Sequence, residues 1–413
     1  MCLTSCEGTL DDIFGEWSRP TGNNGNTKTT VAVKSVTLDE TTLRKAVGDD
    51  AVTLTATVDP SDASDKTVTW KSSDETVATV DASGKVTPTK AGTTTITATA
   101  NDGSGKKATS TVYVYDKIVD ISTDTSVDAG ASWLINGTGT TEDHSITIAN
   151  NSKVTLNGLN ITGRINCTDN ATIILADGSA NTVTAPTGKA GIIIGPSKTL
   201  TIDAETAGTG ILNATGGDGG AGIGTNKNET GGNIVINGGR VTATGGDLAA
   251  GIGTGKASDT SNTCGDITIN GGMVTATGGY NYGAGIGTGY AVYATNTCDA
   301  ITINGGTVTA TGGIYGAGIG TGLTEGDTNT CGAITIKANV TSVTATKGDD
   351  SPNSIGNGFN DSGTQNCGTI TFGTAEVYNG GGDWTTYNSM TAGTYGGLTL
   401  AISGKTWTLT PSN

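Results

Sequence analysis

Apolar and polar residues alternate one by one in many short stretches between residues 200 and 372. Ile301 and Ile303 flank a threonine, and Val308 and Ala310 flank another. Alternation at period two is typical of a strand with one buried face, whereas an amphipathic helix repeats about every 3.6 residues. We therefore predict short strands whose Ile, Val and Ala side chains face a narrow interior and whose Thr side chains face water.

Three phrases recur in a fixed order along this stretch. Ile-Thr-Ile-Asn-Gly-Gly is followed by Val-Thr-Ala-Thr-Gly-Gly and then by Ala-Gly-Ile-Gly-Thr. The third phrase starts at Ala221, Ala250, Ala284 and Ala317, with spacings of 29, 34 and 33 residues. Such a period indicates a solenoid. Three strands and three glycine-marked corners per repeat predict triangular coils stacked about 4.8 Å apart. The predicted fold is all-β, with a parallel β-helix that is right-handed because parallel crossovers almost always are.

Residues 31–115 have a different pattern, in which short alternating runs are separated by turn residues such as Asp59-Pro60. This spacing predicts an immunoglobulin-like β-sandwich, with Trp70 in its core. The phrases also resemble the bacterial Ig-like domain of group 2. They are Val58-Asp-Pro60, Val68–Ser73, Val77–Val80, Gly84–Val86 and Ala91-Gly92. Members of that family serve as stalk and adhesin modules on bacterial surfaces, so the resemblance implies a stalk.

The remaining segments complete the predicted domain organisation. Residues 1–30 comprise a start that resembles a lipoprotein signal remnant and a flexible tether, which is expected because residues 7–30 are rich in turn formers and show no periodicity. Residues 116–413 form the β-helix with a cap at each end. Ile118, Ile121 and Trp133–Ile135 are expected in the N-terminal cap, and the strand-like runs near Leu398–Ile402 and Trp407–Leu409 in the C-terminal one.

The first residues resemble a bacterial lipoprotein box. Leu3-Thr4-Ser5-Cys6 matches the site where a signal peptidase cuts and the new N-terminal cysteine is acylated, although only five residues precede Cys6. Glu7, Asp11 and Asp12 resemble the acidic residues that direct Bacteroidetes-type lipoproteins to the outer face of the outer membrane. The resemblance implies a lipid-anchored protein on the cell surface.

Charge narrows the range of partners. The net charge is −16, and the residues after Ile118 account for −12 of it, with 22 acidic against 10 basic side chains. This balance argues against nucleic acids and anionic membranes as partners, since both require basic patches. No run of 18 apolar residues is present, so we expect contact with a membrane only through the lipid anchor.

Stacked coils convert sequence repeats into columns of like residues. Asn237, Asn270 and Asn304 are expected to form a hydrogen-bonded amide ladder at one corner. A second column contains Cys264, Cys298, Cys331 and Cys367. These cysteines lie close enough to form disulfides or to remain a ladder of buried thiols, and the sequence leaves both states open. A linear row offers no tetrahedral metal site, and the sole histidine, His144, lies elsewhere, so no metal site is predicted.

Tyrosines cluster in the loops on either side of the Ala-Gly-Ile-Gly-Thr phrase. They are Tyr280, Tyr282, Tyr290, Tyr293 and Tyr315. Aromatic faces spaced along a rod suit stacking against sugar rings, so we predict that these five residues bind glycan. The alternative is that they only cover the edge of the coils.

The regular coils resemble the Gly-rich β-helical repeats of bacterial adhesin-like surface proteins, whose architecture is similar to the pectin-lyase-like solenoid. Many β-helices are polysaccharide lyases or hydrolases, which need a strong base or paired carboxylates. Asp218 and Asp247, in matching loops, are the nearest approach to such a pair. We therefore assign no catalytic residues and expect no enzyme and no cofactor, with calcium at Asp349 and Asp350 a weak alternative.

Together these features favour a cell-surface lipoprotein that displays a non-catalytic β-helix for adhesion or glycan binding, with a glycan or a surface ligand of host or bacterium as partner. Two alternatives stay open: a purely structural surface protein, and a polysaccharide-degrading β-helix.

Overall fold

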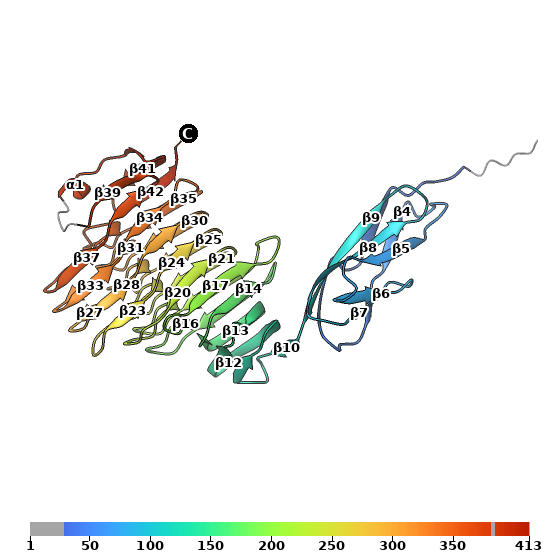
Figure 1. The fold of residues 1–413 in the computed structure, drawn as a ribbon, viewed down its shortest axis with the longest axis horizontal. Coiled ribbons are helices and arrows are strands. Elements are labelled where there is room, and N and C mark those ends of the chain that lie inside the picture. Colours follow the sequence, from blue (N-terminus) through green and yellow to red (C-terminus); the bar gives the residue numbers. More distant parts are fainter. Residues whose placement is uncertain (1–28, 381–384, 413) are drawn as a thin grey trace, which may run out of the picture.

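The computed structural model describes residues 29–380 and 385–412. The expected lipidation site Cys6 and nearly all of the expected tether lie outside these residues. The described chain is almost entirely β-structure, with one short helix, α1 (Thr385–Asn388). Figure 1 shows two parts, a small sandwich and a long stack of strands, which meet near β10 (Lys117–Asp120). The all-β fold class predicted from the sequence is confirmed.

The first part is a sandwich of short sheets. Its four-stranded sheet has the order β2-β9-β8-β5, with β2 (Thr42–Ala46), β9 (Lys107–Tyr115), β8 (Gly92–Ala100) and β5 (Val68–Ser72). The opposing strands are β3 (Val52–Thr53), β7 (Lys85–Pro88), β6 (Ala78–Val80), and the pair β1 (Ser35–Leu38) and β4 (Ala56–Asp59). Trp70 packs against both of the sandwich's buried clusters, as expected for a core residue.

The second part is a parallel solenoid whose strands pair with their equivalents one coil away. Ile301 lies opposite Ile267 on one side and Ile334 on the other, and Val308 lies opposite Val274 and Val343. Like residues therefore stack in register, as the repeats predicted. Most of these strands belong to one 27-stranded sheet that winds around the solenoid.

Three faces make up this sheet. The first contains β10, β12 (Trp133–Ile148), β13 (Lys153–Cys167), β14 (Ala171–Leu175), β17 (Thr199–Ala204), β20 (Asn233–Ile236), β24 (Ile267–Ile269), β29 (Ile301–Ile303), β34 (Ile334–Ile336) and β38 (Ile370–Phe372). The second continues from β12 and β13 through β15 (Ala180–Thr184), β18 (Ile211–Thr215), β21 (Arg240–Thr244), β25 (Met273–Thr277), β30 (Thr307–Thr311) and β35 (Ser342–Thr346). The third contains β11 (Ser126–Ala129), parts of β12 and β13, β16 (Ile192–Ile194), β19 (Ile223–Gly224), β22 (Ile252–Gly253), β26 (Ile286–Gly287), β31 (Ile319–Gly320) and β36 (Ile355–Gly356).

The interior of the solenoid is a single apolar cluster that extends from Val119 to Leu409. Ile267, Ile269 and Ile303 are completely buried, whereas the threonines between them are only half-buried. Burying a branched aliphatic side chain contributes roughly 1.5–3 kcal/mol, so a narrow column of Ile, Val and Ala is enough to hold the coils together.

The segment before the first regular coil differs from the expectation of a cap. Lys117–Asp120 pairs in parallel with the start of β12, and β12 pairs in parallel with β13 along most of its length. These strands are therefore coils of the stack itself. Val119 and Ile121 are buried and Ile118 is only half-buried, while Leu134 and Ile135 are both buried, so these first strands lack the strict alternation of the later repeats.

The regular coils also carry a fourth strand, which corrects the prediction of three strands per repeat. It is the Asn-Thr-Cys phrase, which forms a separate parallel sheet of β23 (Asn262–Cys264), β28 (Asn296–Cys298), β33 (Thr328–Cys331) and β37 (Thr364–Cys367). Asn296 and Cys298 point inward and are fully buried. A smaller pair, β27 (Ala291–Val292) and β32 (Thr324–Glu325), lies in the loop that precedes this strand.

Antiparallel strands close the C-terminal end of the stack, as the sequence predicted. They are β39 (Ala375–Tyr378), β40 (Gly393–Tyr395), β41 (Leu398–Ser403) and β42 (Thr406–Pro411). β42 pairs antiparallel with β35, and β39 with β38, so the last coil presents no open parallel edge on these faces. Within the described ranges, no helix is long and apolar enough to cross a membrane.

Candidate functional site: a tyrosine groove on the solenoid

The structure brings three of the five predicted tyrosines together. The ring of Tyr282 stacks on Tyr290 with centroids 4.7 Å apart, and on Tyr315 of the next coil at 5.6 Å. Phe359 continues the row, 5.3 Å from Tyr315. Tyr280 and Tyr293 are outside this row and are strongly exposed, at 76% and 73%.

These rings line a surface groove with a volume of about 320 Å³. We call it the tyrosine groove and define it by Tyr282, Tyr290, Tyr315, Leu323, Glu325, Phe359 and Asp361. Tyr290 is nearly buried at its base, whereas Tyr282, Tyr315 and Phe359 are half-buried. Because these rings cover one another, the groove presents mainly ring edges, hydroxyl groups and the two carboxylates to a ligand.

Polar contacts fix the position of Tyr290. Its hydroxyl donates a short hydrogen bond to the Glu325 carboxylate, one coil away, and the Lys256 ammonium lies 5.5 Å from the centroid of its ring. Burial, together with this hydrogen bond and the negative charge of Glu325, raises the pKa of Tyr290 well above the usual value. The phenol therefore stays protonated and acts as a donor.

Tyr293 has an uncommon backbone conformation for its residue type. Its φ of 55° lies in the left-handed region, which costs an aromatic L-residue roughly 1–2 kcal/mol. Its ring lies over Gly326, where a Cβ atom would stand 2.8 Å from two ring carbons. A large ring that is held out in water at an energetic cost is a feature of functional sites.

The sequence analysis missed Leu323, Glu325, Phe359 and Asp361. Two of them could have been found from the repeats. Counting from the isoleucine of each Ile-Gly-x-Gly phrase, the fifth residues form the column Lys256, Tyr290, Leu323 and Phe359. This column runs beside the one that contains Tyr282 and Tyr315, so aligning the coils identifies the stretch where both columns carry aromatic rings. Glu325 and Asp361 share a column as the seventh residues by the same count, but Ser258 and Val292 stand at that position in the earlier coils, so the column has no consistent acidic pattern that marks a site.

The cysteine column is present as free thiols. Cys264, Cys298, Cys331 and Cys367 lie in register on adjacent strands, are almost completely buried and form no disulfide among themselves in the structure. The Cys264 thiol donates to the Gly232 carbonyl at 3.7 Å. The amides of Asn237, Asn270 and Asn304 hydrogen-bond to one another in the predicted ladder. Burial also raises the pKa of the separate Cys167 to about 12, which keeps that thiol unreactive.

We expect the five buried cysteines, these four and Cys167, to resist alkylation in the native protein. Burial denies a reagent access to the sulfur atoms, so peptide mapping after iodoacetamide treatment should find these five unmodified without denaturant and modified in its presence. Rapid native alkylation of any of the five would contradict this result, and a linked Cys264–Cys298 peptide in a non-reduced map would show the disulfide state instead.

The candidate carboxylates differ in their surroundings. Asp218 and Asp247 are both exposed, and the Asp247 carboxylate accepts hydrogen bonds of 2.9 and 3.0 Å from the Asn281 amide. Asp349 forms an ion pair with Lys405. Partial burial, together with the nearby charge of Asp266, raises the pKa of Asp299 beside the cysteine column. No three His, Cys, Asp or Glu side chains are grouped to hold a metal in the described part of the chain.

Comparison with known families agrees with both parts of the fold. Residues 32–112 match the bacterial Ig-like domain (group 2), so the sandwich is a domain of that kind. Residues 234–256, 267–290 and 301–323 match the β-helix repeat. The arrangement expected from the sequence, an Ig-like domain followed by β-helix repeats, is thus confirmed, and it fits a surface protein.

The relatives described next match this chain over short segments. An uncharacterised protein of Clostridium acetobutylicum is 53% identical over 62 residues, which is 15% of this chain and 6% of that protein. An α-L-arabinofuranosidase of Bifidobacterium longum is 61% identical over 57 residues, or 14% and 5%. A 3-O-α-D-galactosyl-α-L-arabinofuranosidase of the same species is 49% identical over 65 residues, or 16% and 6%. The chain thus spans a small part of these relatives, and a β-helix is compatible with both enzymes and non-enzymes.

Proposed function

We propose that this protein is a non-catalytic surface module that binds glycans through the tyrosine groove and the two exposed tyrosines beside it. The observation that supports this function is the convergence of tyrosines from successive coils on one groove, which is lined by both aromatic and acidic side chains. Carbohydrate sites combine apolar ring surface with polar groups that bond hydroxyls.

The parts of the site have different roles in this proposal. Tyr280 and Tyr293 supply free ring faces for stacking against a sugar. Glu325 and Asp361 accept hydrogen bonds from sugar hydroxyls, and the stacked row of Tyr282, Tyr290 and Tyr315 forms a rigid floor. The excess of acidic residues on the solenoid disfavours polyanionic glycans, so the ligand is a neutral or amino-bearing sugar chain.

A glycan array on the full chain tests the proposal. We expect binding to neutral glycans, and we expect the double variant Tyr280→Ala/Tyr293→Ala to weaken it at least tenfold, which corresponds to about 1.4 kcal/mol. Both side chains are exposed, so the variant keeps the fold.

Met273→Ala is the matched control, because Met273 is also a large exposed side chain of these coils but lies on β25. It should leave the affinity unchanged. If no glycan binds, or if the double variant binds as well as the parent, the tyrosines only cover the coil edge and the purely structural role remains.

We also propose that the module is displayed on the outer face of the outer membrane through a lipid on Cys6. The Leu3-Thr4-Ser5-Cys6 box and the acidic residues after it support this localisation. Cells fed an alkyne fatty acid should label the protein, and Cys6→Ala should abolish the label and release the protein from the membrane fraction. Unchanged membrane association of the Cys6→Ala protein would contradict a lipid anchor.

A further inference from the structure

Two clefts of about 410 Å³ each lie where the Ig-like domain meets the first coils. The first, which we call the junction cleft, is lined by Tyr113 and Tyr115 of β9 and by Lys153, Thr155 and Asp203 of the solenoid, among others. No residue of the tyrosine groove lines the junction cleft. Figure 1 shows β27, which is close to that groove, on the side of the solenoid away from the Ig-like domain.

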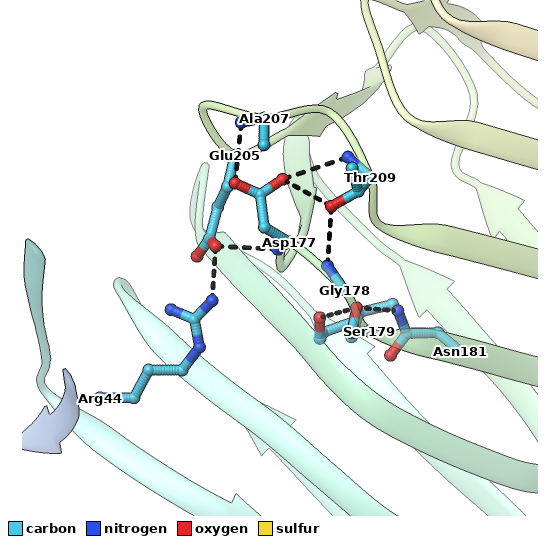
Figure 2. A network of polar contacts seen from close by, with 9 residues as sticks. Arg44, Asp177, Gly178, Ser179, Asn181, Glu205, Ala207 and Thr209 are labelled. Carbon is cyan, nitrogen blue, oxygen red and sulfur yellow. Dashed lines mark hydrogen bonds and ion pairs between the residues drawn. The ribbon is translucent and has the colours of Figure 1, made fainter. Parts of the chain in front are cut away.

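An ion pair between the two domains holds the junction together. Arg44 of β2 reaches across to Glu205, with Nη2 and Oε2 2.5 Å apart and both side chains largely buried. Figure 2 shows how the solenoid fixes Glu205: its carboxylate also accepts the backbone N–H of Asp177 at 2.9 Å, and the Asp177 carboxylate accepts that of Ala207 at 2.8 Å. The walls of the junction cleft are therefore preorganised, which lowers the entropic cost of binding.

Tyr113 divides the two clefts. The guanidinium of Arg44 lies 4.7 Å from the centroid of its ring. Tyr113 lines both clefts, whereas Arg44 lines only the second cleft, beside Thr42 and Asp177. One face of the ring is thus covered by Arg44, and the ring also borders the junction cleft, where it offers an aromatic surface to a ligand.

Tyr115 supplies a buried polar group that has no proper partner. Its residue is only 5% exposed, and its hydroxyl lies near Thr155 but makes no hydrogen bond of ordinary geometry. Burial raises the pKa of Tyr115 to about 12, so the phenol is protonated and able to donate. An unsatisfied buried hydroxyl costs about 1–3 kcal/mol, and because Tyr115 lines the junction cleft, a ligand hydroxyl would relieve this cost once a side-chain shift opens the oxygen to the cleft.

The charges around the cleft restrict the kind of ligand. Asp203 and Glu205 contribute two carboxylates, and Lys153 and the Arg44 that pairs with Glu205 contribute two cationic groups, so the charges at the cleft balance and a neutral sugar is favoured over a charged one. Thr93, Ser132 and Thr206 add hydroxyl groups. Charged groups and hydroxyl groups thus surround one aromatic ring. This combination, in a cleft of this size at a domain interface, is typical of sites for small polyhydroxylated ligands.

We infer that the junction cleft is a second carbohydrate site, which takes a single neutral sugar ring that packs on Tyr113 and hydrogen-bonds to the Tyr115 hydroxyl. The inference is independent of the tyrosine groove, since the two sites share no residue. The Ig-like domain is then part of a binding site as well as a stalk.

Saturation-transfer NMR on the full chain tests this site, with Tyr280→Ala/Tyr293→Ala as background to weaken the tyrosine groove. The probes are methyl α-L-arabinofuranoside, methyl β-D-galactopyranoside and, as the acidic comparison, glucuronate. We expect transfer to at least one neutral glycoside and at least tenfold weaker binding after Tyr115→Phe. The melting temperature of that variant should stay equal or rise, because the lost hydroxyl has no proper partner.

Tyr395→Phe is the matched control, since its hydroxyl bonds the Thr391 carbonyl at the C-terminal end, and it should leave binding unchanged. The inference is overturned if neither neutral glycoside receives saturation, if Tyr115→Phe binds as well as its parent, or if glucuronate binds best. None of these results affects the proposal for the tyrosine groove, which is measured on the chain with that groove intact.

Discussion

Replacing Gly287 by alanine should destabilise the solenoid by more than about 4 kcal/mol. Gly287 has a φ of 129°, and a Cβ atom there would stand 1.8 Å from the carbonyl oxygen of Gly320 in the next coil. Gly253 and Gly320 occupy the same position in the adjacent coils, so the backbone atoms that would have to move are themselves confined. Denaturant unfolding followed by circular dichroism measures the loss.

Gly158→Ala is the matched control for this effect. Gly158 also has a positive φ, 80°, but a Cβ atom there meets nothing within 4 Å. Its replacement should cost only the backbone strain, about 1–2 kcal/mol. Equal losses in the two variants would show that strain, and not the contact between coils, requires glycine on the third face.

The second large effect is expected for Asn296→Leu, at about 3 kcal/mol. Asn296 is fully buried, and its amide donates to the Gly255 carbonyl at 3.0 Å and to that of Tyr290 at 3.4 Å. Leucine is similar in size but cannot donate, so the Gly255 carbonyl would be buried without this bond. The Tyr290 loop would also loosen, so we expect weaker glycan binding in addition to a lower free energy of unfolding.

Asn270→Leu separates this effect from the general loss of an asparagine. Asn270 belongs to the exposed amide ladder, where it bonds Asn237 and Asn304 while remaining open to water. Its replacement should cost at most about 1 kcal/mol, because water satisfies the amides that remain. A cost for Asn270→Leu as large as that for Asn296→Leu would contradict the role assigned to the buried amides.

The main features of the fold followed from sequence periodicity. A phrase such as Ile301–Ile303 predicts a strand, the face of it that points inward and its register with the next coil, since the phrase recurs one coil later. The fourth strand was missed because Asn296–Cys298 begins with a residue type that is usually exposed. Its burial depends on bonds of Asn296 to Gly255 in the previous coil and to Tyr290 in the loop that precedes the strand, which no local pattern reveals.

The candidate sites were predictable to different degrees. The tyrosines were evident because they cluster in the predicted loops, and the position of Phe359 follows from aligning the coils. The stacking of Tyr282 on Tyr290 and the bond from Tyr290 to Glu325 depend on how loops of unequal length fold back, so they needed the structure. The junction cleft was out of reach, because Arg44 and Glu205 are 161 residues apart and belong to different domains.

The connection between the two domains also has a mechanical consequence. Only Asp116 separates β9 from β10, and its backbone N–H donates to the Ser132 carbonyl at 3.0 Å. The Arg44–Glu205 contact is a second point of attachment, so we expect the two domains to move as one rigid body. If a ligand pulls on the distant loops, the load passes through the stacked coils to this joint, so the force would reach the Ig-like domain and would not be absorbed by bending.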